Sequence, residues 1–563
     1  MNTFIKHPPR LSGTPQEANL NDAQNSQIES IQGNIKKIVW SLGITIAKLK
    51  ENQIKAEEIA IACEESGNKY LTPFGALIRK TGNVNEKDEE GSTVLILAAY
   101  NGHAKIIKLL LARPEIQVNE KDREGSTALI WAAFYNHTNI TKLLLEHPDI
   151  LVNEKHSIEN TALIYAADEG HAKIIKLLLT HPDILVNEKN FNGNTALMLA
   201  TEKGHTEIVK LLLGRPEIQV NEKCQHWKTA LLHAASRNDI DLTKLFLARP
   251  EIQVNEEDSD GNTALFYSIK YWNTALTELL IARPEIQVNQ SNSGKNVPLV
   301  ASASYGLIEN FQLLLAHPKI QVNEKTSWGV SIINAAFFNA VINNKLSIVQ
   351  LLLDRPEIQL NVKDSNGYTP LMRAVKDGYK DVTQLLLAHP EIQVNEKTTK
   401  WVTAIIIAVS EDHTDILQLL LAHPDILVNQ SSSNGNTALL SAITKNCLES
   451  AKLLLAHPDI FINHPSPSGE TPLIYAAFYG HTEITQLLLA RSEIEVNEKN
   501  QNGDTALVLA AREDHADIVQ FFIADSRIKF WAHDQWKKAL EQAKNPEIKA
   551  LIEEAMRKQG IDF

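Results

Sequence analysis

The chain has 563 residues, and a single hydrophobic core stops growing at about 250–300 residues, so the chain must hold several domains or a repeat array. Its net charge of −13 argues against nucleic acid as the main partner, because phosphate binding needs a basic face. With 44% apolar and 22% charged residues the chain is typical of a folded protein, and no run of roughly 18 apolar residues predicts a membrane span.

The first 82 residues differ in composition from the rest of the chain. Residues 1–33 are rich in Asn, Gln, Ser and Pro, which predicts a disordered tail, and their start lacks the basic and apolar regions of a signal peptide. Residues 34–82 are predicted to form a helical N-terminal cap, because apolar side chains recur at helical spacing. These side chains are Ile35, Ile38, Val39, Leu42, Ile46 and Leu49.

Residues 83–530 contain about 13 copies of one unit. Each copy carries a Val-Asn pair or a close variant, at intervals of 34 residues with one interval of 38. A second marker, in which Arg or His precedes Pro-x-Ile, keeps the same phase. The asparagines are Asn85, Asn119, Asn153, Asn187, Asn221, Asn255, Asn289, Asn323, Asn361, Asn395, Asn429, Asn463 and Asn497. Two markers in phase over so many copies predict a repeat array.

One copy, residues 120–153, shows the expected elements. It begins with a polar stretch that includes Gly125, which predicts a turn or hairpin finger. Thr127 is a good N-cap for a short first helix, and apolar residues at helical spacing predict a second helix. Pro148 stops the second helix, because the residue before a proline leaves the α region. Neither helix is long enough to be stable alone, so each must pack on the next copy, as in a solenoid.

This unit resembles the ankyrin repeat, a β-turn finger plus two helices with a Thr-Pro-Leu-His-x-Ala motif. The start of the motif occurs at Thr127-Ala128-Leu129, Thr195-Ala196-Leu197, Thr369-Pro370-Leu371 and Thr471-Pro472-Leu473, and Gly-His pairs lead second helices at Gly102-His103, Gly170-His171, Gly204-His205 and Gly480-His481. The resemblance implies an all-α, ankyrin-type solenoid of helix-turn-helix repeats with β-turn or hairpin fingers. Three features depart from the family. The histidine slot of the motif is apolar, as at Ile130, the unit is one residue longer than usual, and Pro148 replaces a glycine.

The middle of the array is its least regular part. Val297 and Ser331 stand where other copies have Thr, and Gly294 is out of phase by one residue. The 38-residue interval carries four extra residues, near 336–340. Four residues are about one helical turn, so we predict a lengthened first helix rather than a looped-out insertion. A duplication scar and a functional change of curvature both stay open as its origin.

Residues 531–563 are predicted to form a helical C-terminal cap, because they repeat the two-helix pattern with a polar outer face. Glu553 and Glu554 in this cap are compatible with a secretion signal, although such a pair is more often a solvated helix face. The nearly uniform copies, rich in Lys, Asn and Ile, resemble the ankyrin proteins of intracellular bacteria, which are often delivered into host cells as effectors. We therefore predict a cytoplasmic protein, or one secreted into a host cell without a classical signal peptide.

The family resemblance implies that a partner lies on the concave side, against the fingers and the exposed end of each first helix. Aromatic residues recur at these helix ends, although packing does not require them there, and aromatics are enriched in interface hot spots. They are Tyr100, Phe134, Tyr135, Tyr271, Tyr305, Phe478 and Tyr479. In the fingers, Trp227 and Trp401 replace the expected glycine and Trp328 precedes one. Each tryptophan is a candidate anchor, unless its ring folds onto the neighbouring finger.

The sequence contains no Gly-rich phosphate loop, Gly-x-Ser-x-Gly elbow or HExxH motif, so we predict no enzyme, no cofactor and no small-molecule substrate. Most of the 19 histidines keep the 34-residue phase, which indicates a structural role, and the three cysteines are too scattered for a disulfide framework or a zinc site. We predict a monomeric protein-binding scaffold whose partner is another protein. The alternative is a structural or regulatory solenoid that binds its own chain or further copies of itself.

Overall fold

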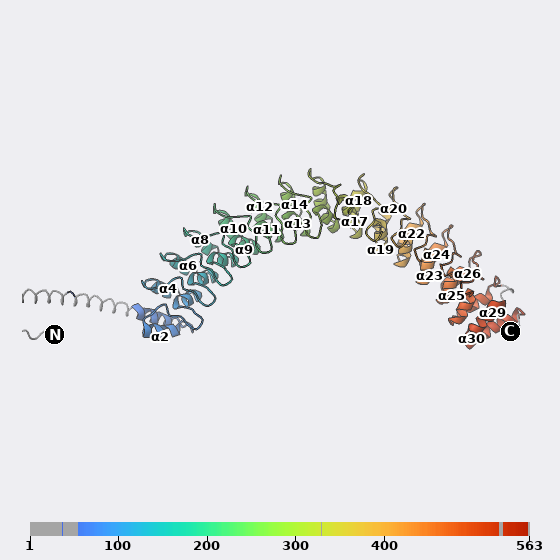
Figure 1. The fold of residues 1–563 in the computed structure, drawn as a ribbon, viewed down its shortest axis with the longest axis horizontal. Helices are drawn as coiled ribbons and strands as arrows, with labels where there is room; N and C mark the ends of the chain where they lie inside the picture. The colour runs from blue at the N-terminus through green and yellow to red at the C-terminus, as the bar shows by residue number, and fades with distance from the viewer. Residues whose placement is uncertain (1–36, 38–54, 328, 529–532, 561–563) are drawn as a thin grey trace, which may run out of the picture. The chain divides into compact units, whose positions relative to one another are not determined.

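The computed structural model describes residues 37, 55–327, 329–528 and 533–560. The chain forms two compact units, residues 1–253 and 254–563, which we call unit 1 and unit 2 and describe separately. Both units consist of helix pairs joined by turns, which confirms the predicted all-α solenoid (Figure 1). Within the described ranges, no helix is long and apolar enough to cross a bilayer.

Unit 1 holds five helix pairs that follow a short helical start, residues 55–65 and α2 (Thr72–Thr81). The first helices are α3 (Val94–Tyr100), α5 (Ala128–Phe134), α7 (Ala162–Asp168), α9 (Ala196–Lys203) and α11 (Ala230–Ser236). The second helices are α4 (Ala104–Leu111), α6 (Thr138–Leu145), α8 (Ala172–Leu178), α10 (Thr206–Leu213) and α12 (Ile240–Leu247). First helices contact first helices of the neighbouring copies and second helices contact second helices, so each row is continuous (Figure 1).

Unit 2 repeats this arrangement with eight helix pairs. Its first helices are α13 (Ala264–Lys270), α15 (Pro298–Tyr305), α17 (Ile332–Ile342), α19 (Pro370–Lys376), α21 (Ala404–Ser410), α23 (Ala438–Thr444), α25 (Pro472–Phe478) and α27 (Ala506–Arg512). Its second helices are α14 (Thr274–Ile281), α16 (Ile308–Leu315), α18 (Leu346–Leu353), α20 (Lys380–Leu387), α22 (Thr414–Leu421), α24 (Leu448–Leu455), α26 (Thr482–Leu489) and α28 (Ala516–Ala524). Two further helices follow, α29 (His533–Gln542) and α30 (Pro546–Lys558).

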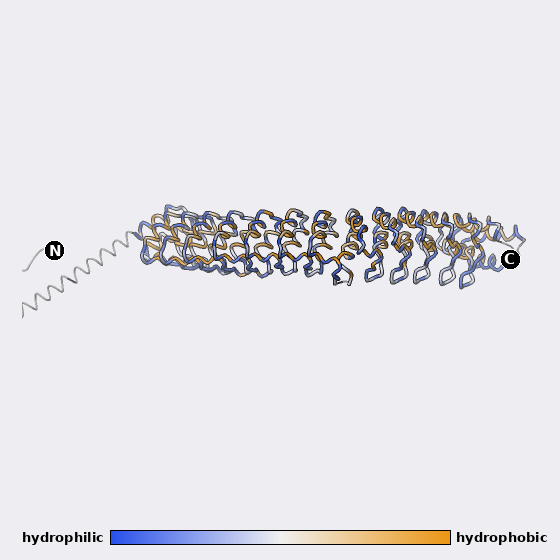
Figure 2. The backbone as a smooth tube through the Cα atoms, turned by 90° about the horizontal axis from the view of Figure 1, so that it is seen from above, coloured by the Kyte–Doolittle hydropathy of each residue, from blue (hydrophilic) through white to orange (hydrophobic). Residues whose placement is uncertain are grey.

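Local sequence accounts for the limits of the first helices. The Thr127 hydroxyl accepts the Ile130 N–H, so Thr127 is the N-cap that the sequence predicts. The helix ends before Asn136, whose φ of 62° is left-handed and cannot continue an α-helix. Between them Ala132 and Ala133 are fully buried, and their small size lets neighbouring first helices approach closely. Figure 2 shows the consequence along the array, with apolar residues recurring on the helices and hydrophilic residues at the turns.

The asparagine of each Val-Asn pair joins its own copy to the next one. Asn153 Nδ2 donates to the Asp183 carbonyl at 2.7 Å, and Asn153 Oδ1 accepts the Leu185 N–H at 2.9 Å. The same two bonds recur at Asn85, Asn119, Asn187, Asn221, Asn255, Asn289, Asn361, Asn395, Asn429 and Asn463. Both partners are backbone groups of the next linker, so this side chain holds the linkers of successive copies in register.

Five of the seven histidines that lead second helices also connect copies. His171 Nε2 donates to the Phe134 carbonyl of the preceding copy at 2.9 Å. Equivalent bonds run from His137, His205, His413 and His515 to the carbonyls of Tyr100, Asp168, Lys376 and Phe478. Glycine in the preceding copy makes room for the ring, since a Cβ on Gly480 would lie 2.5 Å from His515 Cε1. The Gly-His pairs are therefore packing elements that act between neighbouring copies.

The extra residues of the irregular copy are helical, which confirms the predicted lengthening. Helix α17 has 11 residues, whereas α15 has 8 and α19 has 7. In this copy Oδ1 of Asn334, on α17, accepts the Gln359 N–H at 2.8 Å. In other copies the asparagine of the Val-Asn pair makes this bond. Asn323, the Val-Asn asparagine of the copy, is exposed and makes neither bridging bond among the described residues. The longer helix thus brings a different amide to the linker.

The two ends of the array carry further helices. Helix α29 contacts α27, α30 contacts α28, and Trp536 of α29 is fully buried. The i,i+4 ion pairs Glu553–Arg557 (3.7 Å) and Glu554–Lys558 (2.7 Å) place both glutamates on a charged face of α30. The whole predicted tail, residues 1–33, and the first part of the predicted N-terminal cap lie outside the described residues. The domain boundaries at 33, 82 and 530 stay predictions.

Candidate functional site

Five aromatic side chains from three successive copies form one connected group in unit 1, which we call the first aromatic patch: Tyr100, Trp131, Phe134, Tyr135 and Tyr165. The Tyr100 ring lies 5.2 Å from Trp131 and 4.7 Å from Tyr135, between ring centres. Phe134 lies 4.9 Å from Tyr135 and 5.2 Å from Tyr165, which carries the group into the third copy. Tyr100 and Tyr135 are each 39% exposed, and the other three rings are half-buried. The structure therefore brings together three residues named from the sequence, Tyr100, Phe134 and Tyr135.

Fingers and neighbouring copies hold these rings in place. Trp131 Nε1 donates to the Asp122 carboxylate of its own finger at 2.8 Å. The His156 ring, in the next finger, lies 5.8 Å from the Tyr165 ring. Such paired aromatic rings are each worth about 0.5–1.5 kcal/mol beyond the area they bury. The patch is therefore a rigid, preformed surface.

The environment of the patch disfavours negative charge on its tyrosines. Burial and a hydrogen bond with Tyr100 raise the pKa of Tyr135 to about 12. Burial also raises the pKa of Tyr165, and the charges of Glu124 and Asp168 act in the same direction. Both hydroxyls therefore stay protonated at neutral pH and can take part in hydrogen bonds.

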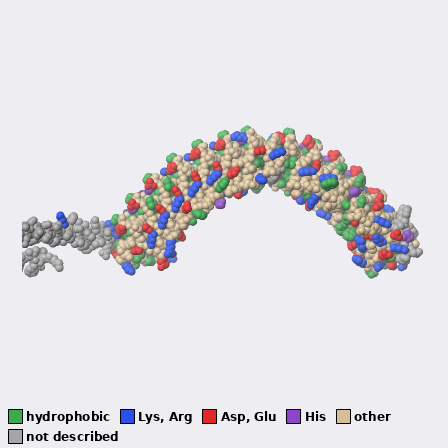
Figure 3. Space-filling view, in the orientation of Figure 1, with side chains coloured by type: hydrophobic (Ala, Val, Ile, Leu, Met, Phe, Trp, Pro, Cys, Tyr) green, Lys and Arg blue, Asp and Glu red, His purple; other side chains and the backbone are tan. Residues whose placement is uncertain are grey.

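The aromatic residues named in unit 2 lie in separate places. Tyr475, Phe478 and Tyr479 form a second aromatic patch, in which Tyr479 lies 6.1 Å from Tyr475 and 4.9 Å from Phe478. Tyr271 is stacked on the buried Tyr267 with ring centres 6.1 Å apart, and Tyr305 is exposed on the following first helix. Acidic and basic side chains are interspersed with apolar ones over the face drawn in Figure 3.

Trp227 and Trp401 occupy the finger position that is glycine in most copies. Their φ values are 59° and 60°, in the left-handed region that costs a bulky residue about 1–2 kcal/mol. The two side chains are 61% and 60% exposed, so their burial offsets little of this conformational free energy. A lysine lies over each ring, Lys223 at 5.7 Å and Lys397 at 5.3 Å. Trp328 lies outside the described residues.

Replacing Trp227 by glycine is expected to raise the free energy of unfolding by about 1 kcal/mol, because glycine adopts this backbone conformation without strain. Urea denaturation of the full chain would measure the change. The matched control is His226→Gly in the same finger, where φ is not left-handed and glycine should be destabilising by about 0.5–1 kcal/mol. A loss of stability in Trp227→Gly would show that the indole ring is needed for folding.

Several exposed apolar side chains were not recognised in the sequence. Trp272 is 68% exposed with a φ of 60°, at the left-handed position that ends a first helix, where most copies have Gly or Asn. Ile158 and Phe191 are exposed on adjacent fingers, joined by the bond from the Phe191 N–H to the Ile158 carbonyl at 3.0 Å. A signal for Trp272 was present, since it replaces the glycine of a Gly-His pair. Ile158 and Phe191 occupy ordinary polar finger positions and had no such signal.

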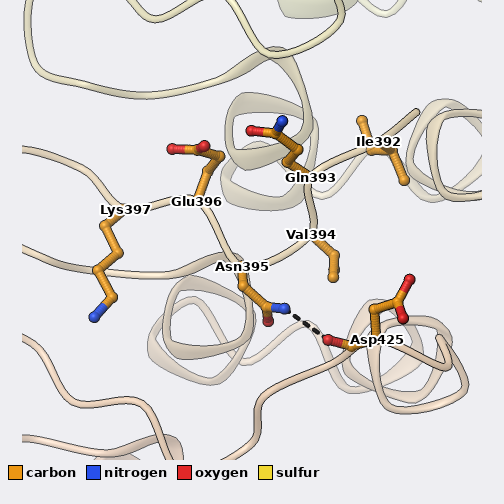
Figure 4. A pocket seen from close by; sticks show the side chains of 7 residues that line it. All are labelled: Ile392, Gln393, Val394, Asn395, Glu396, Lys397 and Asp425. Atoms are coloured by element: carbon orange, nitrogen blue, oxygen red, sulfur yellow. Dashed lines mark hydrogen bonds between the residues drawn. The ribbon is translucent and has the colours of Figure 1, made fainter.

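A surface pocket of about 560 Å³ in unit 2 is lined by Ile392, Gln393, Val394, Asn395, Glu396, Lys397 and Asp425 (Figure 4). Asn395 Nδ2 donates to the Asp425 carbonyl at 2.6 Å, and Glu396 pairs with Lys363 at 2.5 Å. These groups make the same contacts between linkers in other copies. The pocket is therefore the space between successive linkers, and the Asn395 amide and the Glu396 carboxylate that line it already have partners.

The described residues contain no group of three or more His, Cys, Asp or Glu side chains placed to hold a metal ion. Burial raises the pKa of Cys63 to about 11 and also raises the pKa of Cys447. Both thiols are therefore poor nucleophiles at neutral pH, because the thiolate is the reactive form.

A family profile described as ankyrin repeats, three copies long, matches residues 59–156, 149–224, 231–326, 299–398, 393–466 and 458–534. The chain belongs to the ankyrin repeat family. Among solved structures, the crystal structure of EF0377, an ankyrin repeat protein, is 30% identical, covers 35% of this chain and 99% of its own, and gives a TM-score of 0.32. No curated protein sequence matches this chain. Ankyrin repeats are general protein-interaction scaffolds and are typically non-enzymatic.

Proposed function

We propose that this ankyrin repeat protein is a scaffold that holds another protein against its first helices and fingers. The observation that carries the proposal is the first aromatic patch, in which rings from three successive copies form one surface with exposed members. A preformed surface of this kind costs little entropy on binding, and aromatic rings contribute strongly to interface energy.

The proposed contact residues are those named from the sequence. On the first helices they are Tyr100, Phe134, Tyr135, Tyr271, Tyr305, Phe478 and Tyr479, and in the fingers they are Trp227, Trp328 and Trp401. Strain at Trp227 and Trp401 supports a binding role, because exposed bulky residues in left-handed conformations are otherwise unfavourable. Phe134 and Phe478 are half-buried, so we expect them to support the neighbouring tyrosines as well as to touch a partner.

Affinity capture tests the proposal. The full chain and a variant with Phe134, Tyr135, Phe478 and Tyr479 changed to alanine would be used to capture partners from the same host-cell lysate. We expect the variant to lose its partners, because removing an aromatic hot spot costs on the order of 2 kcal/mol or more per residue. Circular dichroism should show equal helix content in both proteins. Retention of the same partners at the same strength would place the binding surface elsewhere.

Sedimentation of the purified chain would separate this proposal from the alternative, self-association. A monomer that captures a foreign protein supports the scaffold, whereas concentration-dependent assembly without a foreign partner supports the alternative. Action as an effector inside a host cell stays a proposal that rests on the composition of the repeats. Delivery of a chain truncated after residue 543 tests a C-terminal signal, and unchanged delivery would count against one.

A further inference from the structure

The fingers and first helices around the first aromatic patch are strongly acidic. Residues 88–101, 122–136 and 156–170 hold eight carboxylates against a single arginine, Arg123. The carboxylates are Asp88, Glu89, Glu90, Asp122, Glu124, Glu159, Asp168 and Glu169. Backbone bonds between finger tips join these segments, from the Arg123 N–H to the Glu90 carbonyl at 3.0 Å and from the Ser157 N–H to the Glu124 carbonyl at 2.8 Å.

Most of this charge is not neutralised within the protein. Glu124 lies 3.7 Å from His156, Glu159 lies 3.9 Å from Lys155, and Asp168 lies 3.7 Å from Lys203. These are long contacts, and Oδ1 of Asp168 is buried without a hydrogen-bond partner. Among the described residues, Glu89, Glu90 and Glu169 have no ion pair at all and are exposed.

Lysines close to the fingers form their short ion pairs with carboxylates outside the fingers. Lys87, Lys121 and Lys155 each precede one of these three fingers. They pair with the glutamate at the start of the next copy, Lys87 with Glu120 at 2.6 Å, Lys121 with Glu154 at 2.5 Å and Lys155 with Glu188 at 2.7 Å. Within the described ranges, Lys87 and Lys121 therefore do not pair with the finger carboxylates, and Lys155 reaches only Glu159, at 3.9 Å.

In the part of the chain that the structure describes, the rings of the first aromatic patch have no cation over them, unlike several other exposed rings. Lys69 lies 4.7 Å from the Tyr70 ring, Lys270 lies 5.9 Å from the Tyr271 ring, and lysines lie over Trp227 and Trp401. No lysine or arginine of the described chain lies over Tyr100, Trp131, Phe134, Tyr135 or Tyr165. The patch thus combines free aromatic faces with uncompensated negative charge.

We infer that the first aromatic patch binds a basic segment of a partner protein, with arginine or lysine side chains over the rings and their charges against the finger carboxylates. This inference rests on the proposed scaffold function and specifies its partner. A cation over an aromatic face gains about 0.5–2 kcal/mol, and nearby carboxylates attract the same group. Nucleic acid is disfavoured at this surface, because its phosphates would face the carboxylates.

The geometry of the repeat sets the spacing of the basic residues. Neighbouring first helices lie about 8–10 Å apart, and an extended peptide advances about 3.3 Å per residue. Basic residues three positions apart in an extended segment would therefore meet equivalent sites in successive copies. About seven residues suffice to cross the three copies of the patch.

The test uses the full chain and fluorescent heptapeptides with arginine at the first, fourth and seventh positions and glycine elsewhere. Fluorescence anisotropy should show binding of this peptide that weakens with added salt, and no binding of the counterpart with glutamate in place of arginine. The double variant Glu124→Gln, Glu169→Gln should bind roughly fivefold more weakly, and Tyr135→Ala roughly tenfold more weakly. No binding of the arginine peptide would overturn the inference, as would a preference for single-stranded oligothymidine.

Two control variants separate local from general effects. Glu207→Gln removes a glutamate of similar exposure on α10 in the same unit, and Tyr70→Ala removes an exposed tyrosine outside the patch. Both should bind like the unchanged chain, and equal losses in them would overturn the inference. Another result would be a captured protein partner that requires Phe134 and Tyr135 yet binds equally well to the Glu124→Gln, Glu169→Gln variant and at high salt. That result would overturn the inference that the partner is basic and would leave the scaffold function standing. Loss of capture altogether would count against the scaffold function itself.

Discussion

Replacing Asn153 by alanine is expected to lower the free energy of unfolding by about 1–3 kcal/mol. The side chain makes two bonds to the following copy, to the Asp183 carbonyl at 2.7 Å and from the Leu185 N–H at 2.9 Å. Alanine removes both bonds, and each contributes about 0.5–1.5 kcal/mol net of the water that replaces it. Urea denaturation would measure the total loss, and hydrogen exchange of the Leu185 amide would report the local one.

Asn323→Ala is the matched control for this effect. Asn323 holds the same position in its own copy but is exposed and makes neither bridging bond among the described residues. Its replacement is expected to change the free energy of unfolding by less than about 0.5 kcal/mol, as for other surface positions. Equal losses at Asn153 and Asn323 would show that the asparagine acts through its own turn and not through the next copy.

A second large effect is expected at His233, on the buried side of α11. Burial, aided by the positive charge of Lys228, lowers the pKa of His233 to about 4. Its Nε2 is buried without a hydrogen-bond partner, and the nearest carboxylate, Glu202, is 4.0 Å from Nδ1. In the unfolded chain histidine has a pKa of about 6.5. Below that pH the unfolded state therefore binds a proton that the folded state does not bind until the pH approaches 4. The resulting stability is present above about pH 6.5 and is lost as the pH falls towards 4, by about 3 kcal/mol in total.

His233→Leu is expected to remove this dependence. Leucine is the residue at the equivalent position of the preceding copy, Leu199, which is also buried. At about pH 5 the variant should be more stable than the unchanged chain by about 2 kcal/mol beyond any difference at about pH 8. Urea denaturation at the two pH values measures this. A difference that does not change with pH would mean that His233 is as accessible to protons in the folded protein as in the unfolded one.

The candidate site was only partly predictable from the sequence. Exposed ends of first helices were identified correctly at Tyr100, Tyr135 and Tyr479, because the repeat defines which positions packing leaves free. Trp131 and Tyr165 complete the first aromatic patch through contacts between copies, and no single copy reveals those contacts. Trp272 was missed, although its left-handed backbone makes it as unusual as Trp227 and Trp401.

Charge shows the same division between local and tertiary information. The eight carboxylates near the first aromatic patch can be counted in the sequence, yet their significance depends on which acids are paired. Lys121 looks available in the sequence, but it pairs with Glu154 of the next copy and donates to the Lys155 carbonyl at 3.1 Å. Only this tertiary pairing shows that the fingers keep an excess of negative charge.

The sequence by itself determined the period, the helix pairs, their caps and the lengthening of α17. These depend on interactions within one turn or one helix, such as the Thr127 cap, the left-handed residue at Asn136 and the addition of one helical turn. The tertiary structure decided what the phased residues do, because their partners lie 30 to 37 residues away in a neighbouring copy. Asn153 and His171 repeat in the sequence for a reason that exists only once the copies have stacked, and Asn334 replaces Asn323 for the same reason.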